Sequence, residues 1–178
     1  MLNADQFIEK INPQGRDLKR IREAYDYGLS RHEGQLRKFS GLPYFIHPIR
    51  VALIVRDHDD DIIIASLLHD VVEDTNATIA DIESRFGLKV ASLVKGMTKT
   101  DDTTIFEAID SVIDQYPEIV MIKIADRIDN LSDNFDKLAD STKQRYKEET
   151  PMIIEYAESR GLNELTQELK HLYAKILE

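Results

Sequence analysis

The chain has 178 residues, 42% hydrophobic and 31% charged, a balance that predicts one soluble globular domain and excludes a largely disordered protein. It has no cysteine and no uncharged run near the roughly 18 residues of a membrane-spanning helix, which argues against thiolate sites and a membrane partner. Its net charge of −10, with no basic run and no recognisable signal peptide, favours a cytoplasmic location and argues against a nucleic-acid partner.

The first third of the chain is expected to be helical on both sides of one polar loop. Apolar residues at helical spacing predict helices over residues 5–11, 16–32 and 48–56. The loop, residues 35–44, carries Arg37 and Lys38, two adjacent cations in an acidic chain. His47 is placed at the N-terminus of the third helix, because proline is well tolerated in a first helical turn and Pro48 follows it.

A helix that is apolar all round is predicted to begin near Asp61, and such helices are normally buried. Its last turn would carry His69, Asp70, Glu73 and Asp74, in which residues four apart form two adjacent ridges. Burying these groups costs on the order of several kcal/mol each unless they pair or bind a metal. The helix dipole also disfavours anions at a C-terminus, so a cation is expected there.

The rest of the chain also shows helical periodicity. It predicts helices over residues 78–86, 88–97, 105–115, 142–160 and 163–177. A second strongly apolar helix begins at Pro117 and is expected to end in polar groups, with Asp126 and Asn130 on one face. No segment alternates as a strand would, so the sequence predicts a single all-α domain, a helical bundle over residues 1–178.

The chemistry of the chain favours a catalytic metal site. Two imidazoles, His47 and His69, and two carboxylates, Asp70 and Asp126, suit a divalent cation such as Mn²⁺, Fe²⁺ or Zn²⁺. Four protein ligands on an octahedral ion leave two positions for water and substrate. A neighbouring carboxylate can then orient or deprotonate the water.

Other polar residues have simpler interpretations. His32 lies on the apolar stripe of its helix and is interpreted as a core or loop-bracing residue. Asp133 is assigned to the surface, and residues 101–102 to a solvated loop. Arg127 is expected to pair with local acids, and Tyr146 fits the core and the rim of a pocket equally well.

Four ordered motifs carry a resemblance to a known family. They are residues 32–44, His47-Pro48, residues 69–75 and residues 124–130. This set resembles the HD-domain hydrolase of RelA/SpoT-type alarmone enzymes, and it includes the Glu73-Asp74 pair that general HD proteins lack. The length of the chain leaves no room for a synthetase domain, so the small, hydrolase-only members are the expected relatives.

The resemblance implies a helical HD domain that hydrolyses the 3′-pyrophosphate of (p)ppGpp with manganese, giving GDP or GTP and pyrophosphate. By position, the ligands of one metal per chain would be His47, His69, Asp70 and Asp126. Glu73 and Asp74 would activate the water. Fe²⁺ or Zn²⁺ would suit the same ligands.

The resemblance also implies contacts to a guanine nucleotide. Arg37 would stack on the base, Lys38 would approach the phosphates, and Asn130 would help to hold the sugar and its 3′ group. Tyr146 is counted with these substrate-binding residues. Compared with the family pattern, Phe39 is one extra residue between Arg37-Lys38 and Ser40-Gly41. This extra residue can shift Arg37 relative to the base.

Two alternative functions remain open at this point. The first is an HD phosphohydrolase of another 3′- or 2′-phosphorylated nucleotide, such as NADPH, because the segment between Met97 and Pro117 is shorter than in the long bifunctional enzymes. The second is an inactive nucleotide-binding module, which would be expected to lack a ligand or the Glu-Asp pair. The sequence predicts no particular oligomeric state.

Overall fold

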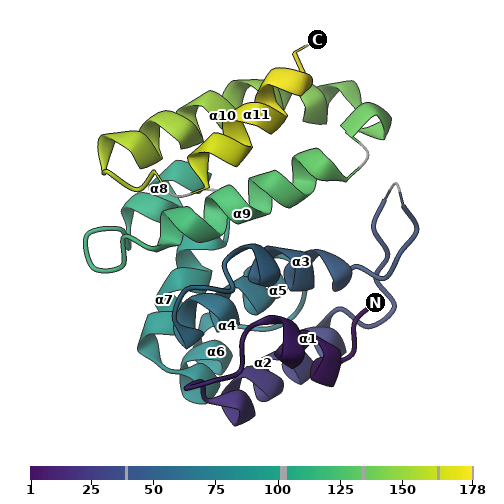
Figure 1. The fold of residues 1–178 in the computed structure, drawn as a ribbon, viewed down its shortest axis with the longest axis vertical. Helices are drawn as coiled ribbons and strands as arrows, with labels where there is room; N and C mark the ends of the chain where they lie inside the picture. Colours follow the sequence, from purple (N-terminus) through teal and green to yellow (C-terminus); the bar gives the residue numbers. More distant parts are fainter. Residues whose placement is uncertain (39, 101–103, 134, 164, 178) are drawn as a thin grey trace.

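The computed structural model describes residues 1–38, 40–100, 104–133, 135–163 and 165–177 (Figure 1). In chain order the elements are α1 (Ala4–Lys10), α2 (Leu18–Arg31), α3 (Ile46–Ile54), α4 (Asp60–Leu68), α5 (Val71–Asp74), α6 (Ile79–Phe86), α7 (Leu88–Met97), α8 (Ile105–Asp110), α9 (Ile119–Ser132), the 3-10 helix η1 (Phe135–Lys137), α10 (Asp140–Ser159) and α11 (Thr166–Lys175). Within the described ranges the β-type pairing amounts to one isolated antiparallel bridge, between Leu36 and Pro43. The all-α prediction is confirmed.

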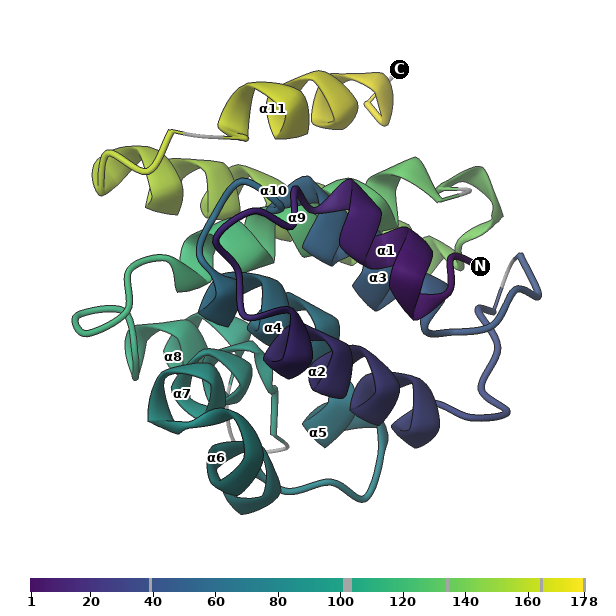
Figure 2. The same cartoon turned by 60° about the horizontal axis from the view of Figure 1, so that its bottom comes forward.

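Helix α9 lies at the centre of the molecule. It packs against α10 and α11 on one side and against α3, α4 and α7 on the other, as Figures 1 and 2 show. Nearly all of its residues are buried, including the charged Lys123, Asp126, Arg127 and Asp129. Charged groups in such a position need partners or a ligand.

Helix α4 is the second buried helix, and every residue from Ile62 to Leu68 is shielded by α2, α3 and α7. The expected continuous helix through Asp74 is wrong, because α4 ends at Leu68 and α5 is a separate single turn. His69 and Asp70 form the turn between them, and the ring of His69 donates from Nδ1 to the Ser66 carbonyl, 2.8 Å away. The break turns the polar residues away from the axis of α4.

Helix α9 also differs from its prediction. It continues to Ser132, so Asp126 lies in the body of the helix, whereas Asn130 lies in its last turn. Helix α8 is shorter than expected and ends at Asp110. The last helix begins at Thr166, and its N-cap is Leu165, whose φ is 64°.

Several predicted boundaries agree with the structure. The hydroxyl of Thr78 accepts from the N–H of Asp81, whose carboxylate accepts in return, which makes the expected capping box of α6. Helix α7 has the predicted bounds, and Pro151 lies inside α10. Among the described residues, no helix combines the length and apolar character needed to cross a membrane.

Candidate metal centre and active site

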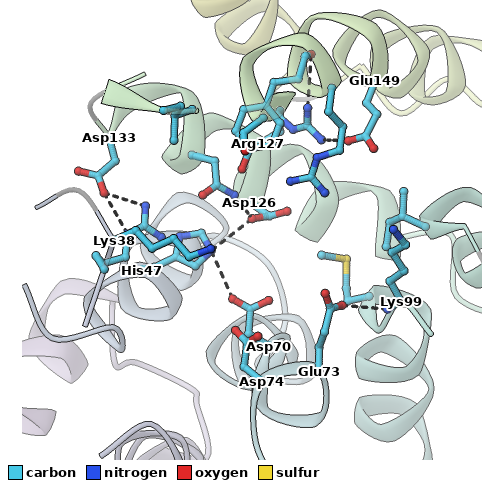
Figure 3. A pocket seen from close by; sticks show the side chains of 18 of the residues that line it. Lys38, His47, Asp70, Glu73, Asp74, Lys99, Asp126, Arg127, Asp133 and Glu149 are labelled. Atoms are coloured by element: carbon cyan, nitrogen blue, oxygen red, sulfur yellow. Dashed lines mark hydrogen bonds and ion pairs between the residues drawn. The ribbon is translucent and has the colours of Figure 1, made fainter. Parts of the chain in front are cut away.

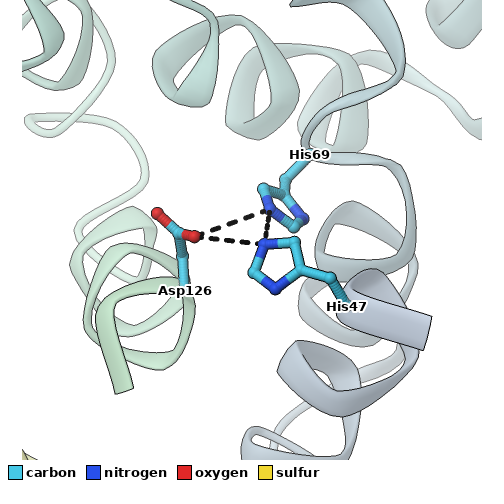
Figure 4. Close-up of side chains that lie close together, drawn as sticks. All are labelled: His47, His69 and Asp126. Atoms are coloured by element: carbon cyan, nitrogen blue, oxygen red, sulfur yellow. Dashed lines mark hydrogen bonds and ion pairs between the residues drawn. The ribbon is translucent and has the colours of Figure 1, made fainter. Parts of the chain in front are cut away.

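Three buried side chains from distant segments meet at one point (Figure 4). His47 lies in the first turn of α3, His69 follows α4, and Asp126 projects from the middle of α9. The Nε2 atoms of the two histidines are 3.3 Å apart. Oδ1 of Asp126 lies 3.2 Å from Nε2 of His47 and 4.0 Å from Nε2 of His69. The three groups therefore offer ligand atoms to a common position.

The other ring nitrogens determine what these Nε2 atoms can do. Nδ1 of His47 donates to Oδ2 of Asp129 over 2.7 Å, and Nδ1 of His69 donates to the Ser66 carbonyl. Because both acceptors are oxygens, each Nδ1 carries the hydrogen and each Nε2 can present a lone pair to the common position. Two facing lone pairs and a carboxylate are suitable donors for a divalent cation.

The electrostatics of the cluster favour a positive charge at the same point. Burial lowers the pKa of His47, but hydrogen bonds to Asp126 and Asp129 outweigh it and raise the pKa to about 9. Burial would raise the pKa of the Asp126 carboxyl, yet Lys123 and His47 hold it well below its usual range. His47, His69 and Asp126 thus form a group that fits a divalent metal.

Asp70 adds a second carboxylate beside the two imidazoles. Its Oδ2 lies 3.1 Å from Nε2 of His69 and 3.6 Å from Nε2 of His47. The same oxygen accepts a hydrogen bond from the hydroxyl of Tyr44 over 2.7 Å. All four residues expected as ligands therefore lie together. The contact of Tyr44 was not expected.

Glu73 and Asp74 lie next to this group on α5, and Figure 3 shows both beside Asp70. Both residues are exposed, and partial desolvation of each carboxyl is the largest cause that raises its pKa. The negative charge of Asp70 raises both pKa values further. The N–H of Lys99 donates to Oε2 of Glu73 over 2.9 Å, which partly opposes the increase.

These groups open into a cavity of about 950 Å³ between α5, α9 and α10. All four residues assigned to substrate binding line it: Arg37, Lys38, Asn130 and Tyr146. The cavity wall also carries four cations that the sequence interpretation left out of the substrate site: Lys99, Lys123, Arg127 and Arg145. The spacing of Lys123 and Asp126, three apart on one helix, was a signal for the ion pair between them, 2.9 Å long.

Arg37 is held in an ion pair instead of standing free in the cavity. Its Nε and Nη2 lie 2.9 and 2.8 Å from Oδ2 of Asp133, and 11% of each side chain is exposed. The assignment of Asp133 to the surface is therefore wrong, because the loop that carries Arg37 covers it. Phe39 and residues 101–102 lie outside the described residues.

Two other residues behave as interpreted. His32 is buried, bonds Gln35 through Nδ1 over 2.8 Å and stacks on the ring of Tyr44, so it braces the loop. Arg127 pairs with Glu149 and lies 4.2 Å from the centre of the Tyr146 ring. The side chain of Asn130 also has a local partner, since its amide donates to Oδ1 of Asp126.

Known proteins resemble both the sequence and the fold. The bifunctional (p)ppGpp synthase/hydrolase SpoT of Escherichia coli K12 is 33% identical over 180 residues, which span 94% of this chain and 25% of SpoT. The guanosine-3′,5′-bis(diphosphate) 3′-pyrophosphohydrolase of Aquifex aeolicus is 32% identical over 166 residues, 88% of this chain and 24% of its own. This chain thus spans about a quarter of the length of these curated relatives.

Solved structures agree with this likeness. A metazoan ortholog of SpoT, described as hydrolysing ppGpp, superposes with a TM-score of 0.74 at 28% identity, over 88% of this chain and 94% of the other. The structure of lmo0812 from Listeria monocytogenes EGD-e superposes with a TM-score of 0.60 at 28% identity, over 78% of this chain and all of the other. The HD domain family model matches residues 24–158, most of the chain, including all three residues of the buried cluster. The chain therefore belongs to the HD domain family.

Proposed function

We propose that the chain is a metal-dependent phosphohydrolase that removes the 3′-pyrophosphate of the guanosine alarmones (p)ppGpp, giving GDP or GTP and pyrophosphate. The observation that carries the proposal is the Glu73-Asp74 pair beside the buried group of His47, His69 and Asp126, at the edge of one large cavity. The likeness to proteins named as (p)ppGpp hydrolases supports the choice of substrate.

We assign the metal ligands to His47, His69, Asp70 and Asp126, and the metal to one Mn²⁺ per chain. Two nitrogen and two carboxylate donors suit Mn²⁺, although Fe²⁺ and Zn²⁺ accept the same donors. When bound, a divalent cation supplies Lewis acidity toward water and phosphoryl oxygens. The protein contributes the orientation of the rings, which the Nδ1 hydrogen bonds fix.

We assign the handling of the water proton to Glu73 and Asp74. A carboxylate with a raised pKa accepts a proton more readily near neutral pH than a fully solvated one. Glu73 is held by the N–H of Lys99, and Asp74 lies in the same single-turn helix, so both carboxylates keep a fixed place beside Asp70.

We assign recognition of the nucleotide to Arg37, Lys38, Asn130 and Tyr146. The ion pair of Arg37 with Asp133 uses the N–H groups in the guanidinium plane, which leaves the faces of the group for stacking on a base. Lys38 is exposed at the cavity, where an ammonium can meet phosphate. The amide of Asn130 lies beside Asp126 and lines the cavity, which supports its assignment to the sugar and its 3′ group.

We further infer one HD-type domain over residues 1–178, acting in the cytoplasm on a small guanine nucleotide, with no nucleic-acid or membrane partner. The net charge of −10 supports the absence of a nucleic-acid partner, since a polyanion would be repelled. The cations that line the cavity offset this repulsion locally for a small nucleotide.

One assay tests the proposed function. The purified chain is incubated with Mn²⁺ and a panel containing ppGpp, pppGpp, GTP and NADPH, and released pyrophosphate and phosphate are measured separately. We expect pyrophosphate from the two alarmones and no release without the metal. If phosphate were released from NADPH and nothing from the other nucleotides, the substrate would be NADPH instead of the alarmones. If no nucleotide of the panel were hydrolysed, an inactive nucleotide-binding module would be favoured.

A further inference from the structure

A buried carboxylate that has no role in the assignments above lies directly behind the group of His47, His69 and Asp126, which we call the metal group. Asp129, on α9, is 5% exposed. Its Oδ2 accepts the hydrogen bond from Nδ1 of His47 over 2.7 Å. It does not offer an oxygen to the point where the two Nε2 atoms meet, because the His47 ring lies between.

The same carboxylate is held on its other side by two arginines. Nη2 of Arg37 lies 3.6 Å from Oδ2 of Asp129, and Nη1 of Arg50 lies 3.7 Å from Oδ1. Both arginines also reach Asp133, the C-cap residue that follows α9, at 2.8 and 3.8 Å. Two cations therefore face two acids at the C-terminal end of α9.

This arrangement has a physical consequence for His47. A buried carboxylate without cations would be costly, but here the arginines offset its charge and it remains an acceptor. An acceptor at Nδ1 fixes both the tautomer and the rotation of an imidazole that binds a metal through Nε2. His69 obtains the same restraint from a backbone carbonyl, whereas His47 depends on a side chain.

We propose that Asp129 is a positioning residue, which holds the His47 imidazole with Nε2 turned toward the metal group and is itself held by Arg37 and Arg50. The inference rests on the metal-dependent function proposed above. It joins the loop over residues 35–44 to the metal centre, because Arg37 belongs to that loop. Asp133 shares the two arginines, whereas the acceptor on Nδ1 of His47 is Asp129, so Asp133 provides a matched control.

The test is titration of Mn²⁺ into the metal-free protein by calorimetry, without substrate. Asp129→Ala should weaken Mn²⁺ binding by about 10- to 100-fold, the usual effect of losing a residue that orients a metal ligand. Asp129→Asn, which keeps an acceptor oxygen, should recover most of the affinity. Asp133→Ala should stay within about twofold of wild type, although it frees Arg37 and should raise KM for ppGpp.

Thermal unfolding of each metal-free variant shows whether a loss of Mn²⁺ affinity is caused by loss of the fold or by loss of the contact with His47. If Asp129→Ala does not fold, Asp129→Leu, which matches the size of asparagine but has no acceptor, replaces it. Equal Mn²⁺ affinity in the wild type and in the variant without an acceptor would overturn the proposal. Equal losses at positions 129 and 133 would also overturn it, because the ion pairs and not the histidine contact would then be responsible.

The outcomes for positioning and for the proposed function can be told apart. A wild-type chain that binds Mn²⁺ with the predicted dependence on Asp129, yet releases no pyrophosphate from ppGpp, contradicts only the choice of substrate. A chain that hydrolyses ppGpp with unchanged Mn²⁺ affinity in Asp129→Ala contradicts only the positioning role. A wild-type chain that binds no Mn²⁺ contradicts both.

Discussion

Four carboxyl groups in the site have opposite surroundings although they lie close together. Asp126 is buried and Asp70 is partly buried, but the neighbouring imidazoles hold the pKa of Asp70 below its usual range, and Lys123 and His47 do the same for Asp126. Glu73 and Asp74 have raised pKa values because partial desolvation and the charge of Asp70 act together. Environments that separate pKa values in this way suit two permanent anions and two proton acceptors.

The first residue-scale prediction concerns the Asp70 carboxylate. Asp70→Ala removes a candidate ligand and should lower Mn²⁺ content and pyrophosphate release together, by about 100-fold or more, because an open site with few ligands tolerates no loss. Metal analysis after desalting and the pyrophosphate assay measure both. The exposed Asp57→Ala serves as control, and full metal occupancy in Asp70→Ala would remove this residue from the ligand set.

The second residue-scale prediction separates chemistry from metal binding. Glu73→Gln keeps the shape of the side chain and one acceptor oxygen for the N–H of Lys99, but it cannot take a proton. Turnover of ppGpp should fall by roughly 100-fold or more while Mn²⁺ affinity stays within about threefold. Steady-state kinetics and calorimetry provide the two values, with the exposed Glu83→Gln as control. Unchanged turnover would show that Glu73 does not accept the water proton.

The motifs indicated the residues of the site better than their partners. That the candidate ligands and the Glu73-Asp74 pair belong to one site could be predicted, because those residue types are costly to bury without a cation. The contacts of Tyr44 with Asp70 and of Asp129 with His47 could not, because each joins segments far apart in the chain. Such contacts depend on how α3, α4 and α9 pack, and spacing along one segment does not contain that information.

At the scale of elements, the break between α4 and α5 shows a limit of periodicity. Apolar and polar positions through residues 62–74 fit one helix, and the sequence offers no glycine or proline to end it. The structure ends α4 at Leu68, where the ring of His69 bonds the Ser66 carbonyl. A side chain that competes for a backbone acceptor can end a helix without a turn residue.

The loop over residues 35–44 is attached to the site at three points. Arg37 pairs with Asp133 at the C-terminal end of α9, the amide of Gln35 donates to the carbonyl of Asp74, and Tyr44 donates to Asp70. Each attachment ends on a residue beside the metal group or the Glu73-Asp74 pair. Gln35, Arg37 and Tyr44 are therefore attached to other residues of the cavity wall.

An element-scale prediction follows for Arg37. Arg37→Ala should raise KM for ppGpp about 10-fold or more with a smaller change in kcat, because a base contact distant from the bond being cut is mostly uniform binding. Arg37→Lys keeps the charge but loses the planar group, so it should restore little of the stacking. Kinetics with guanine and adenine nucleotides measure the effect. If Arg37→Ala kept the wild-type KM and base preference, other residues would have to recognise the base.

At the scale of the whole molecule, the candidate ligands come from the central helix α9 and from the helices on one side of it. His47 and His69 belong to the part built from α1 to α7, whereas Asp126 belongs to α9, on which α10 and α11 pack. Most of the helices, and with them the all-α fold class, could be predicted from periodicity. The arrangement of the helices around α9 could not. A metal bound at the meeting point would add a further link between segments that are already joined by apolar packing, by the His47–Asp129 hydrogen bond and by the ion pairs of Arg37 and Arg50.

The last prediction tests that link through stability. A ligand that binds only the folded state stabilises it by about 2.7 kcal/mol at a free concentration 100 times its Kd. For a chain of this length, about 2–4 °C in Tm accompanies each kcal/mol, so Mn²⁺ in that excess should raise Tm by about 5–10 °C over the EDTA-treated protein. Differential scanning calorimetry should also show Tm rising further with the logarithm of the Mn²⁺ concentration. Asp70→Ala should have a much smaller increase at the same concentration, because the loss of its carboxylate raises Kd. Equal Tm values for the wild type with Mn²⁺ and with EDTA would contradict binding of Mn²⁺ to the folded chain in that concentration range.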